Sequence, residues 1–105
     1  MAETTLLDRL DGLDARFDEI STLITDPAVI ADQKRYVRLT KEYHDLETIL
    51  AAKKRYKSAL DAIEESKDLL ASESDEEMRA LAREELDEAS ARLPQLEEEI
   101  KLLLI

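Results

Sequence analysis

The chain has 105 residues, of which 39% are charged and only 4% aromatic, and it contains one Gly, two Pro and no Cys. This composition is typical of long helices, excludes disulfides and thiolate metal sites, and agrees with a reducing cytoplasm. The net charge of −11 makes the chain as a whole a poor ligand for nucleic acid, and its longest apolar run, residues 102–105, is too short to span a membrane.

A first helix is predicted over residues 4–25. Its apolar side chains recur every three or four residues and form one seam. The members of this seam are Leu6, Leu10, Leu13, Phe17, Ile20 and Ile24. Gly12 is its one weak position and costs about 1 kcal/mol relative to Ala. Asp26 and Pro27 form a helix-capping pair, so the helix should end near Thr25 and a short turn should follow over residues 27–31.

A second helix, capped by Asp32, is predicted over residues 32–71. At 1.5 Å per residue it is a rod of roughly 60 Å, too long for a compact globule, so it should protrude or pair along its length. Its three tyrosines, Tyr36, Tyr43 and Tyr56, fall on the apolar seam. We therefore interpret them as core residues and not as platforms for stacking bases.

A third helix is predicted over residues 75–104. Ser74 and Glu77 have the spacing of a capping box at its start. Pro94 removes the hydrogen bond to the carbonyl of Ser90, and because the seam keeps its phase across Pro94 we expect one kinked helix. The alternative is that two helices meet at Pro94.

Together these elements predict an all-α fold. The expected architecture is an elongated antiparallel three-helix bundle, or coiled-coil hairpin, with a shorter first helix and a single domain over residues 1–105. The final four aliphatic residues, 102–105, either pack in the bundle or mark a sequence cut from a longer protein, and we favour the cut.

No pattern for catalysis is present. His44 is the only histidine, and a di-iron bundle needs two Glu-x-x-His pairs. The acidic runs at residues 73–77 and 97–99 lack the loop glycine of a calcium site. We expect no enzyme activity, no catalytic residue, no cofactor and no metal, with His44 on a solvated helix surface.

Residues 34–57 hold eight basic and three acidic residues, a net charge of +5. The basic residues form two groups: Lys34, Arg35, Arg38 and Lys41, then Lys53, Lys54, Arg55 and Lys57. One interpretation is that the acidic outer helices neutralise them within the chain, which contributes little stability per exposed pair. The other is that they contact ribosomal RNA through its phosphates, without sequence readout.

Several short motifs occur in a familiar order and spacing. They are Asp26-Pro27, Ile30-Ala31-Asp32, Arg35, Lys41-Glu42-Tyr43, Leu46, Asp68-Leu69-Leu70, Met78, residues 82–86 and the leucines of residues 102–104. In this order the sequence resembles, over nearly its whole length, the N-terminal domain of bacterial class I peptide chain release factors of the first type, which reads UAA and UAG.

The resemblance implies a cytoplasmic role in translation termination. In that family a Pro-x-Thr-type tripeptide reads the codon and a Gly-Gly-Gln loop promotes peptidyl-tRNA hydrolysis, and neither motif occurs here. The family implies a helical arm at the stalk base of the large ribosomal subunit, in contact with protein and rRNA, and interplay with the class II release-factor GTPase. It also implies that the protein continues beyond Ile105.

The alternative from a different class is a free-standing structural coiled coil that self-associates through its apolar seams. The isolated chain, in particular, could form a homodimer by burying these seams. Polar substitution of Leu46 or Leu60 would weaken such a rod, whereas reversal of the first basic group would weaken a ribosome-docking arm.

Overall fold

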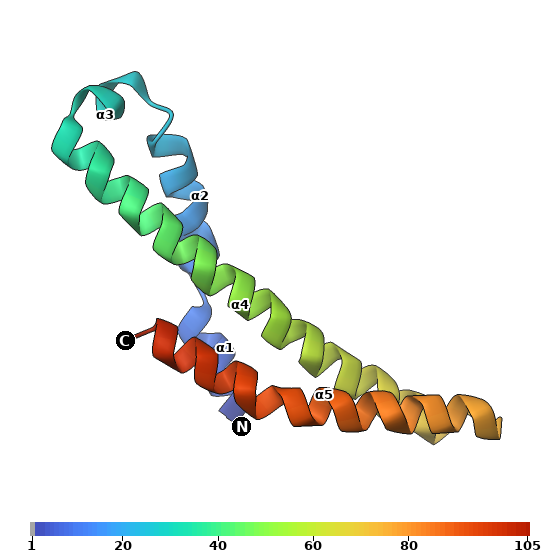
Figure 1. Ribbon diagram of the computed structural model, residues 1–105. Helices are drawn as coiled ribbons and strands as arrows, with labels where there is room; N and C mark the ends of the chain where they lie inside the picture. Colours follow the sequence, from blue (N-terminus) through green and yellow to red (C-terminus); the bar gives the residue numbers. More distant parts are fainter. Residues whose placement is uncertain (1) are drawn as a thin grey trace. The chain divides into compact units, whose positions relative to one another are not determined.

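The computed structural model describes residues 2–105, with side chains described from Leu6 onward. Within this range every regular element is a helix, which confirms the all-α class (Figure 1). The helices are α1 (Ala2–Leu10), α2 (Leu13–Leu23), α3 (Pro27–Ala31), α4 (Gln33–Ser72) and α5 (Glu76–Leu103). They divide into two compact units, one up to Ala51 and one from Ala52. The description of residues 1–105 as a single domain stays a prediction.

The helix predicted over residues 4–25 is wrong as one helix, because Gly12 separates α1 from α2. Gly12 has a φ of 89°, in the left-handed region that glycine enters without a steric penalty. The amide of Asp11 donates to the carbonyl of Asp8 at the end of α1, and the amide of Arg16 donates to the carbonyl of Gly12 at the start of α2. A seam that keeps its phase across a glycine therefore did not ensure a continuous helix.

In unit 1, α2 lies beside the first half of α4, and α3 closes the end of the pair (Figure 1). The predicted caps are confirmed. Asp26 accepts a hydrogen bond from the amide of Ala28 (2.9 Å) at the start of α3, where Pro27 occupies the first helical position. Asp32 accepts from the amide of Arg35 (3.2 Å) at the start of α4. These caps satisfy amides that have no partner inside the helix.

The core of unit 1 consists of large apolar side chains. Ile20, Val29, Leu39 and Leu46 are buried, and partly buried Leu13, Phe17, Leu23, Ile24, Tyr36 and Tyr43 pack against them. The rings of Phe17 and Tyr43 stack with their centroids 4.8 Å apart. The prediction that the tyrosines are core residues is therefore confirmed for Tyr36 and Tyr43. It is also confirmed for Tyr56 in unit 2, which is fully buried.

In unit 2, α5 returns antiparallel along the second half of α4, and this confirms the predicted helical hairpin (Figure 1). Its buried residues are mostly small: Ala52, Tyr56, Ala59, Ser66, Ala82, Ala89 and Ile100. Because the spacing of packed helices follows the size of the side chains between them, this row of small residues permits a close approach of α4 and α5.

The turn of the hairpin differs from the predicted capping box. The N-cap of α5 is Asp75, whose carboxylate accepts from the amide of Met78 (3.1 Å), so the assignment of Ser74 with Glu77 is wrong. The side chain of Glu73 accepts instead from the amides of Ser74 and Asp75. Arg79 donates to the carbonyls of Leu70 and Glu73 and so satisfies acceptors at the end of α4. The carboxylates of Asp75 and Glu73 thus accept from the backbone amides at this turn, where the hydroxyl of Ser74 was expected to do so.

Pro94 lies inside α5, which continues to Leu103. The predicted single helix is therefore confirmed, and the alternative of two helices meeting at Pro94 is wrong. Pro94 is exposed. The kink that we expect there stays a prediction.

Candidate interaction surfaces

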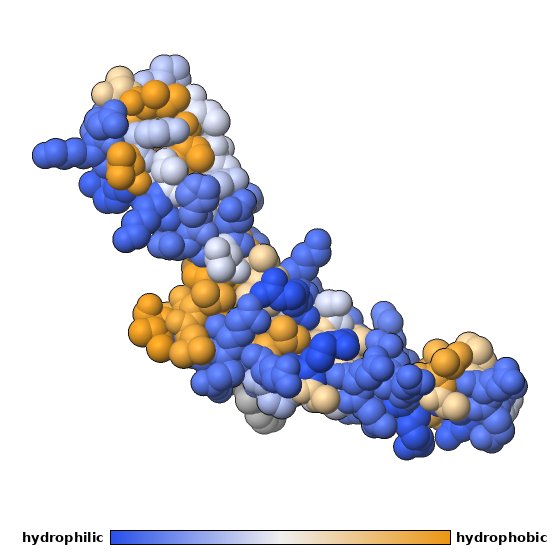
Figure 2. Space-filling view, viewed as in Figure 1, coloured by the Kyte–Doolittle hydropathy of each residue, from blue (hydrophilic) through white to orange (hydrophobic). Residues whose placement is uncertain are grey.

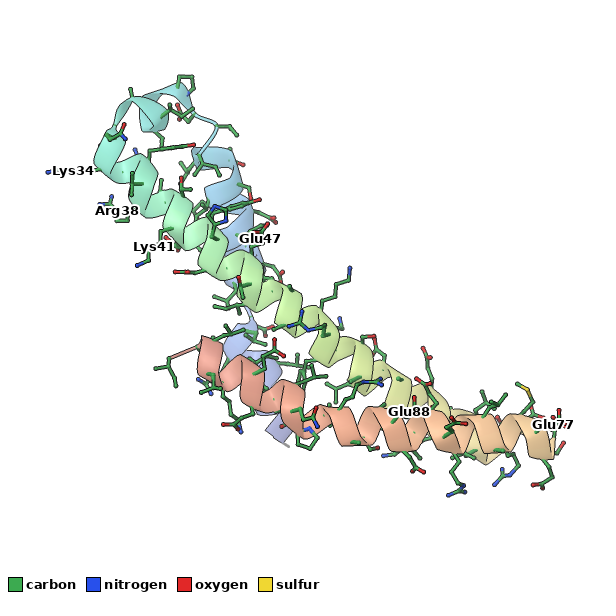
Figure 3. All side chains as sticks on the ribbon, in the orientation of Figure 1. Lys34, Arg38, Lys41, Glu47, Glu77 and Glu88 are labelled. Carbon is green, nitrogen blue, oxygen red and sulfur yellow. The ribbon has the colours of Figure 1, made fainter. Side chains whose placement is uncertain are left out.

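The first basic group forms one exposed surface on α4 in unit 1. Lys34, Arg38 and Lys41 are spaced by four and three residues, which places them along one side of a helix, and all three are exposed. Figure 3 shows them pointing away from α2. Arg35, next to Lys34, is also exposed. We call these four residues the basic face.

Val37 accompanies the basic face, Ile30 is exposed on α3 before it in the chain, and sequence reasoning missed both. Val37 is 57% exposed and lies one turn from both Lys34 and Lys41, while Ile30 at the end of α3 is 48% exposed. Figure 2 shows apolar side chains at the surface of this end of unit 1, among polar ones. The signal was available, because Val37 is an aliphatic residue outside the apolar seam of its helix.

Neutralisation within the chain does not account for the basic face. In the part of the chain that the structure describes, none of its four cations forms an ion pair. Glu42, an acidic neighbour of the face on α4, is engaged by Arg16 of α2 through two hydrogen bonds of 2.7 and 2.8 Å. That hydrogen-bonded guanidinium holds the pKa of Glu42 below its ordinary value. The charge of Glu42 is thus already balanced by Arg16.

The second basic group lies in unit 2. Lys54, Arg55 and Lys57 are exposed, whereas Lys53 is half-buried. Arg55 forms an ion pair with Glu99 of α5, so for this residue the interpretation of internal neutralisation is correct. Through this ion pair the group is partly neutralised within the chain, unlike the basic face, and Lys53 also interacts with another group.

A groove between α4 and α5 runs beside this second group. It has a volume of about 370 Å³ and is lined by Lys54, Arg55, Ser58, Ala59, Arg92 and Leu96. Arg92 of α5 was not among the predicted contact residues, because the pairing of α5 with α4 that brings it beside Lys54 is not visible in the sequence. Cations above an apolar floor suit an anionic group attached to a flat or apolar body, such as a nucleotide.

His44 was predicted to lie on a solvated helix surface. His44 is 67% exposed and its Nδ1 lies 3.6 Å from Glu47, as predicted for a solvated histidine. Over the described residues, no group of three or more His, Asp or Glu side chains is placed to hold a metal ion. None of the helices in this range has an apolar stretch of the length that a bilayer requires.

The family model of the PCRF domain matches residues 13–105. The chain belongs to this family. All eight predicted contact residues lie inside the matched range, as does Arg92. The resemblance noted from the order and spacing of the motifs is therefore confirmed. No solved structure matches the chain.

Three relatives of this PCRF chain show how far the similarity extends. The chain is 63% identical over 102 residues to "Peptide chain release factor 1" of Bacteroides thetaiotaomicron, covering 97% of this chain and 28% of that protein. The protein of the same name from Parabacteroides distasonis is 63% identical over 105 residues, covering 100% and 28%. That from Clostridium tetani is 39% identical over 100 residues, covering 95% and 28%. The chain thus spans about 28% of the length of these curated relatives.

Proposed function

We propose that this chain is the N-terminal ribosome-docking arm of a class I peptide chain release factor that acts at UAA and UAG stop codons. The observation that carries the proposal is membership of the PCRF family together with 63% identity to proteins named peptide chain release factor 1. Codon reading and peptidyl-tRNA hydrolysis belong, in this proposal, to other parts of the protein. The arm itself is not an enzyme and works in the cytoplasm, where ribosomes are.

The basic face supports docking on the ribosome. Four exposed cations that form no ion pair within the described residues can neutralise phosphates, and exposed Val37 adds an apolar contact for protein. We propose that this face meets protein and rRNA at the stalk base of the large subunit. Interplay with the class II release-factor GTPase is part of the same proposal.

The groove lined by Lys54, Arg55 and Arg92 supports a second, weaker contact. Its cations are partly engaged within the chain, since Arg55 pairs with Glu99. A cation that is already paired within the chain neutralises a phosphate less fully on binding, and so releases fewer counterions, than a cation without an ion pair. The basic face should therefore dominate the affinity.

The test is a charge reversal with a matched control. The double variant Lys34→Glu/Arg38→Glu and the control Lys67→Glu/Arg83→Glu change the net charge equally, and all four residues are exposed on helices. Co-sedimentation of the chain with purified bacterial ribosomes is measured over a range of salt concentrations. We expect the first variant to lose binding and to reduce the slope of log affinity against log salt by about 2, with little change in the control.

The same experiment tests the alternative of a self-associating coiled coil. Equal ribosome binding by both variants would contradict docking through the basic face. Sedimentation equilibrium of the chain and of Leu46→Gln then measures self-association: a stable dimer that Leu46→Gln dissociates would favour the coiled coil. Leu46 is buried in the core of unit 1, so circular dichroism must accompany that variant.

A further inference from the structure

A second groove lies near the turn of the hairpin in unit 2. It has a volume of about 300 Å³ and is lined by Ala62, Glu65, Ser66 and Leu69 of α4 and by Met78, Leu81, Ala82 and Glu85 of α5. Met78 is 43% exposed and Leu81 is 61% exposed, so the groove has an apolar wall open to solvent. Figure 2 shows apolar surface at this end of the hairpin, bordered by polar side chains. We call it the hairpin groove.

The row of small residues explains why the apolar wall is exposed. Ala82 is buried between the helices, with Ala62 and Ser66 opposite it on α4, and none of the three fills much space. Larger neighbours such as Leu81 then lie outside the row of small residues between the two helices, where they are exposed to solvent. Large aliphatic side chains exposed in a group, in contrast to scattered single ones, mark contact surfaces.

The surroundings of the hairpin groove are strongly acidic. Residues 61–88 contain twelve acidic and three basic residues, a net charge of −9 out of −11 for the whole chain. Glu65 and Glu85 line the groove itself, and within the described residues neither forms an ion pair. Figure 3 labels Glu77 and Glu88, which lie along α5 on either side of the groove residues in the chain. The apolar wall is therefore framed by carboxylates that form no ion pair within the described part of the chain.

We propose that the hairpin groove binds a basic amphipathic helix of a protein partner. Apolar residues on one side of such a helix would contact Leu81 and Met78, and Lys or Arg residues flanking them would meet Glu65 and Glu85. The flexible thioether of Met78 adapts to different apolar side chains. Nucleic acid is a poor occupant, because its phosphates repel a segment with a charge of −9.

A second copy docking groove to groove is also a poor occupant. A two-fold interface would bring two such acidic segments together, and like charges across an interface oppose association. The proposal is separate from ribosome docking through the basic face, because it concerns another surface and can be tested with a peptide alone.

The experiment measures binding of the 105-residue chain to a fluorescent synthetic peptide. The probe is a Leu/Lys amphipathic helix of about 18 residues, or five turns, and its control is a scrambled peptide of the same composition with no separate apolar face. We expect the amphipathic peptide to bind at least about tenfold more tightly than the scrambled one. Equal binding of the two peptides, or no binding, would overturn the proposal, since charge attraction alone does not distinguish them.

Matched variants locate the site. Leu81→Gln and Val37→Gln each make an exposed aliphatic residue polar, at 61% and 57% exposure, and circular dichroism checks that both stay helical. Leu81→Gln should weaken peptide binding about tenfold, and Val37→Gln should leave it unchanged. The pair Glu65→Gln/Glu85→Gln should weaken it and reduce its salt dependence.

Two results would reject this site. Unchanged peptide binding by Leu81→Gln would place the peptide elsewhere on the chain. Self-association that Leu81→Gln abolishes, measured by sedimentation without peptide, would instead assign the groove to a second copy.

Discussion

The two units of this chain are both built from helices, but they bury side chains of different size. Unit 1 buries branched and aromatic side chains such as Ile20, Leu39 and stacked Phe17 and Tyr43. Unit 2 buries mainly alanines, with Tyr56 and Ile100 as its large members. Large buried residues give a unit a core that is sensitive to truncation, whereas small ones give helices a close contact that is sensitive to enlargement.

The units also differ in the charge they present. Unit 1 exposes the basic face around Val37, while unit 2 carries the acidic hairpin groove around Leu81. Both surfaces place an exposed aliphatic residue among charges of one sign. The two proposals give the chain two partners of opposite charge, although its net charge of −11 by itself favours only basic partners.

Truncation in the core of unit 1 should have the largest effect. Ile20→Ala removes a fully buried side chain and should lower the free energy of unfolding by about 2–5 kcal/mol, measured by urea denaturation followed by circular dichroism. The control Ile30→Ala changes a residue that is 48% exposed and should cost far less. Equal losses for the two variants would contradict the core described for unit 1.

Enlargement in unit 2 should have the next largest effect. Ala89→Leu places a bulky side chain at a position of 0% exposure and should cost about 1–3 kcal/mol through overpacking. Ala91→Leu, on the exposed side of α5, should be nearly neutral and is the matched control in the same unfolding experiment. If Ala89→Leu were as stable as Ala91→Leu, the close contact of α4 with α5 would not be a feature of the folded chain.

Replacing Gly12 between α1 and α2 should lower the free energy of unfolding by somewhat less than these core substitutions. Gly12→Ala meets no atom within 4 Å, so its penalty is the strain of a φ of 89° alone, about 1 kcal/mol. Gly12→Asn should lose less, because asparagine enters the left-handed region more readily. A rise in both helicity and stability in Gly12→Ala would instead indicate that α1 and α2 join into the single helix first predicted.

The pair of Arg16 with Glu42 should give the smallest effect, and one that depends on pH. The hydrogen bond from Arg16 lowers the pKa of Glu42 in the folded chain below its ordinary value of 4.5, which applies in the unfolded chain. The carboxylate is therefore ionised more readily in the folded chain. The stabilisation is therefore present above pH 4.5 and is lost as the pH falls through the lowered pKa of the folded state. It is modest, because both side chains are more than a third exposed.

Thermal unfolding of Glu42→Gln checks this effect. The variant should melt below the unsubstituted chain at neutral pH, and the difference should disappear in acid. The control Glu64→Gln alters an exposed carboxylate that forms no ion pair within the described residues, and it should leave the melting temperature little changed. A difference between Glu42→Gln and the parent that persisted in acid would assign it to packing and not to charge.

Much of the helical structure could be read from local rules. The caps at Asp26 and Asp32, the uninterrupted helix α4 and the continuity of α5 through Pro94 depend on residues within one or two turns of each other. Two local assignments failed where the sequence offered more than one local option. Gly12 allowed either a continuous helix or a break, and Asp75 replaced Ser74 as the cap of α5.

The candidate surfaces were predictable only in part. The basic face followed from the spacing of Lys34, Arg38 and Lys41 on one helix, and its lack of ion partners required the structure. Arg92 beside Lys54, and Leu81 across from Ala62, join residues on different helices. Their proximity depends on the register of α5 against α4.

Periodicity, caps and charge within single helices thus determined the class, the long helices α4 and α5 and the basic face, because these depend on short-range spacing along one backbone. Which residues meet across the hairpin was decided by how buried alanines and one tyrosine interlock between α4 and α5. Seams that repeat every three or four residues permit several registers of similar pattern, and only the packing of the actual side chains distinguishes them. The hairpin groove depends on this register, because its lining residues come from both α4 and α5.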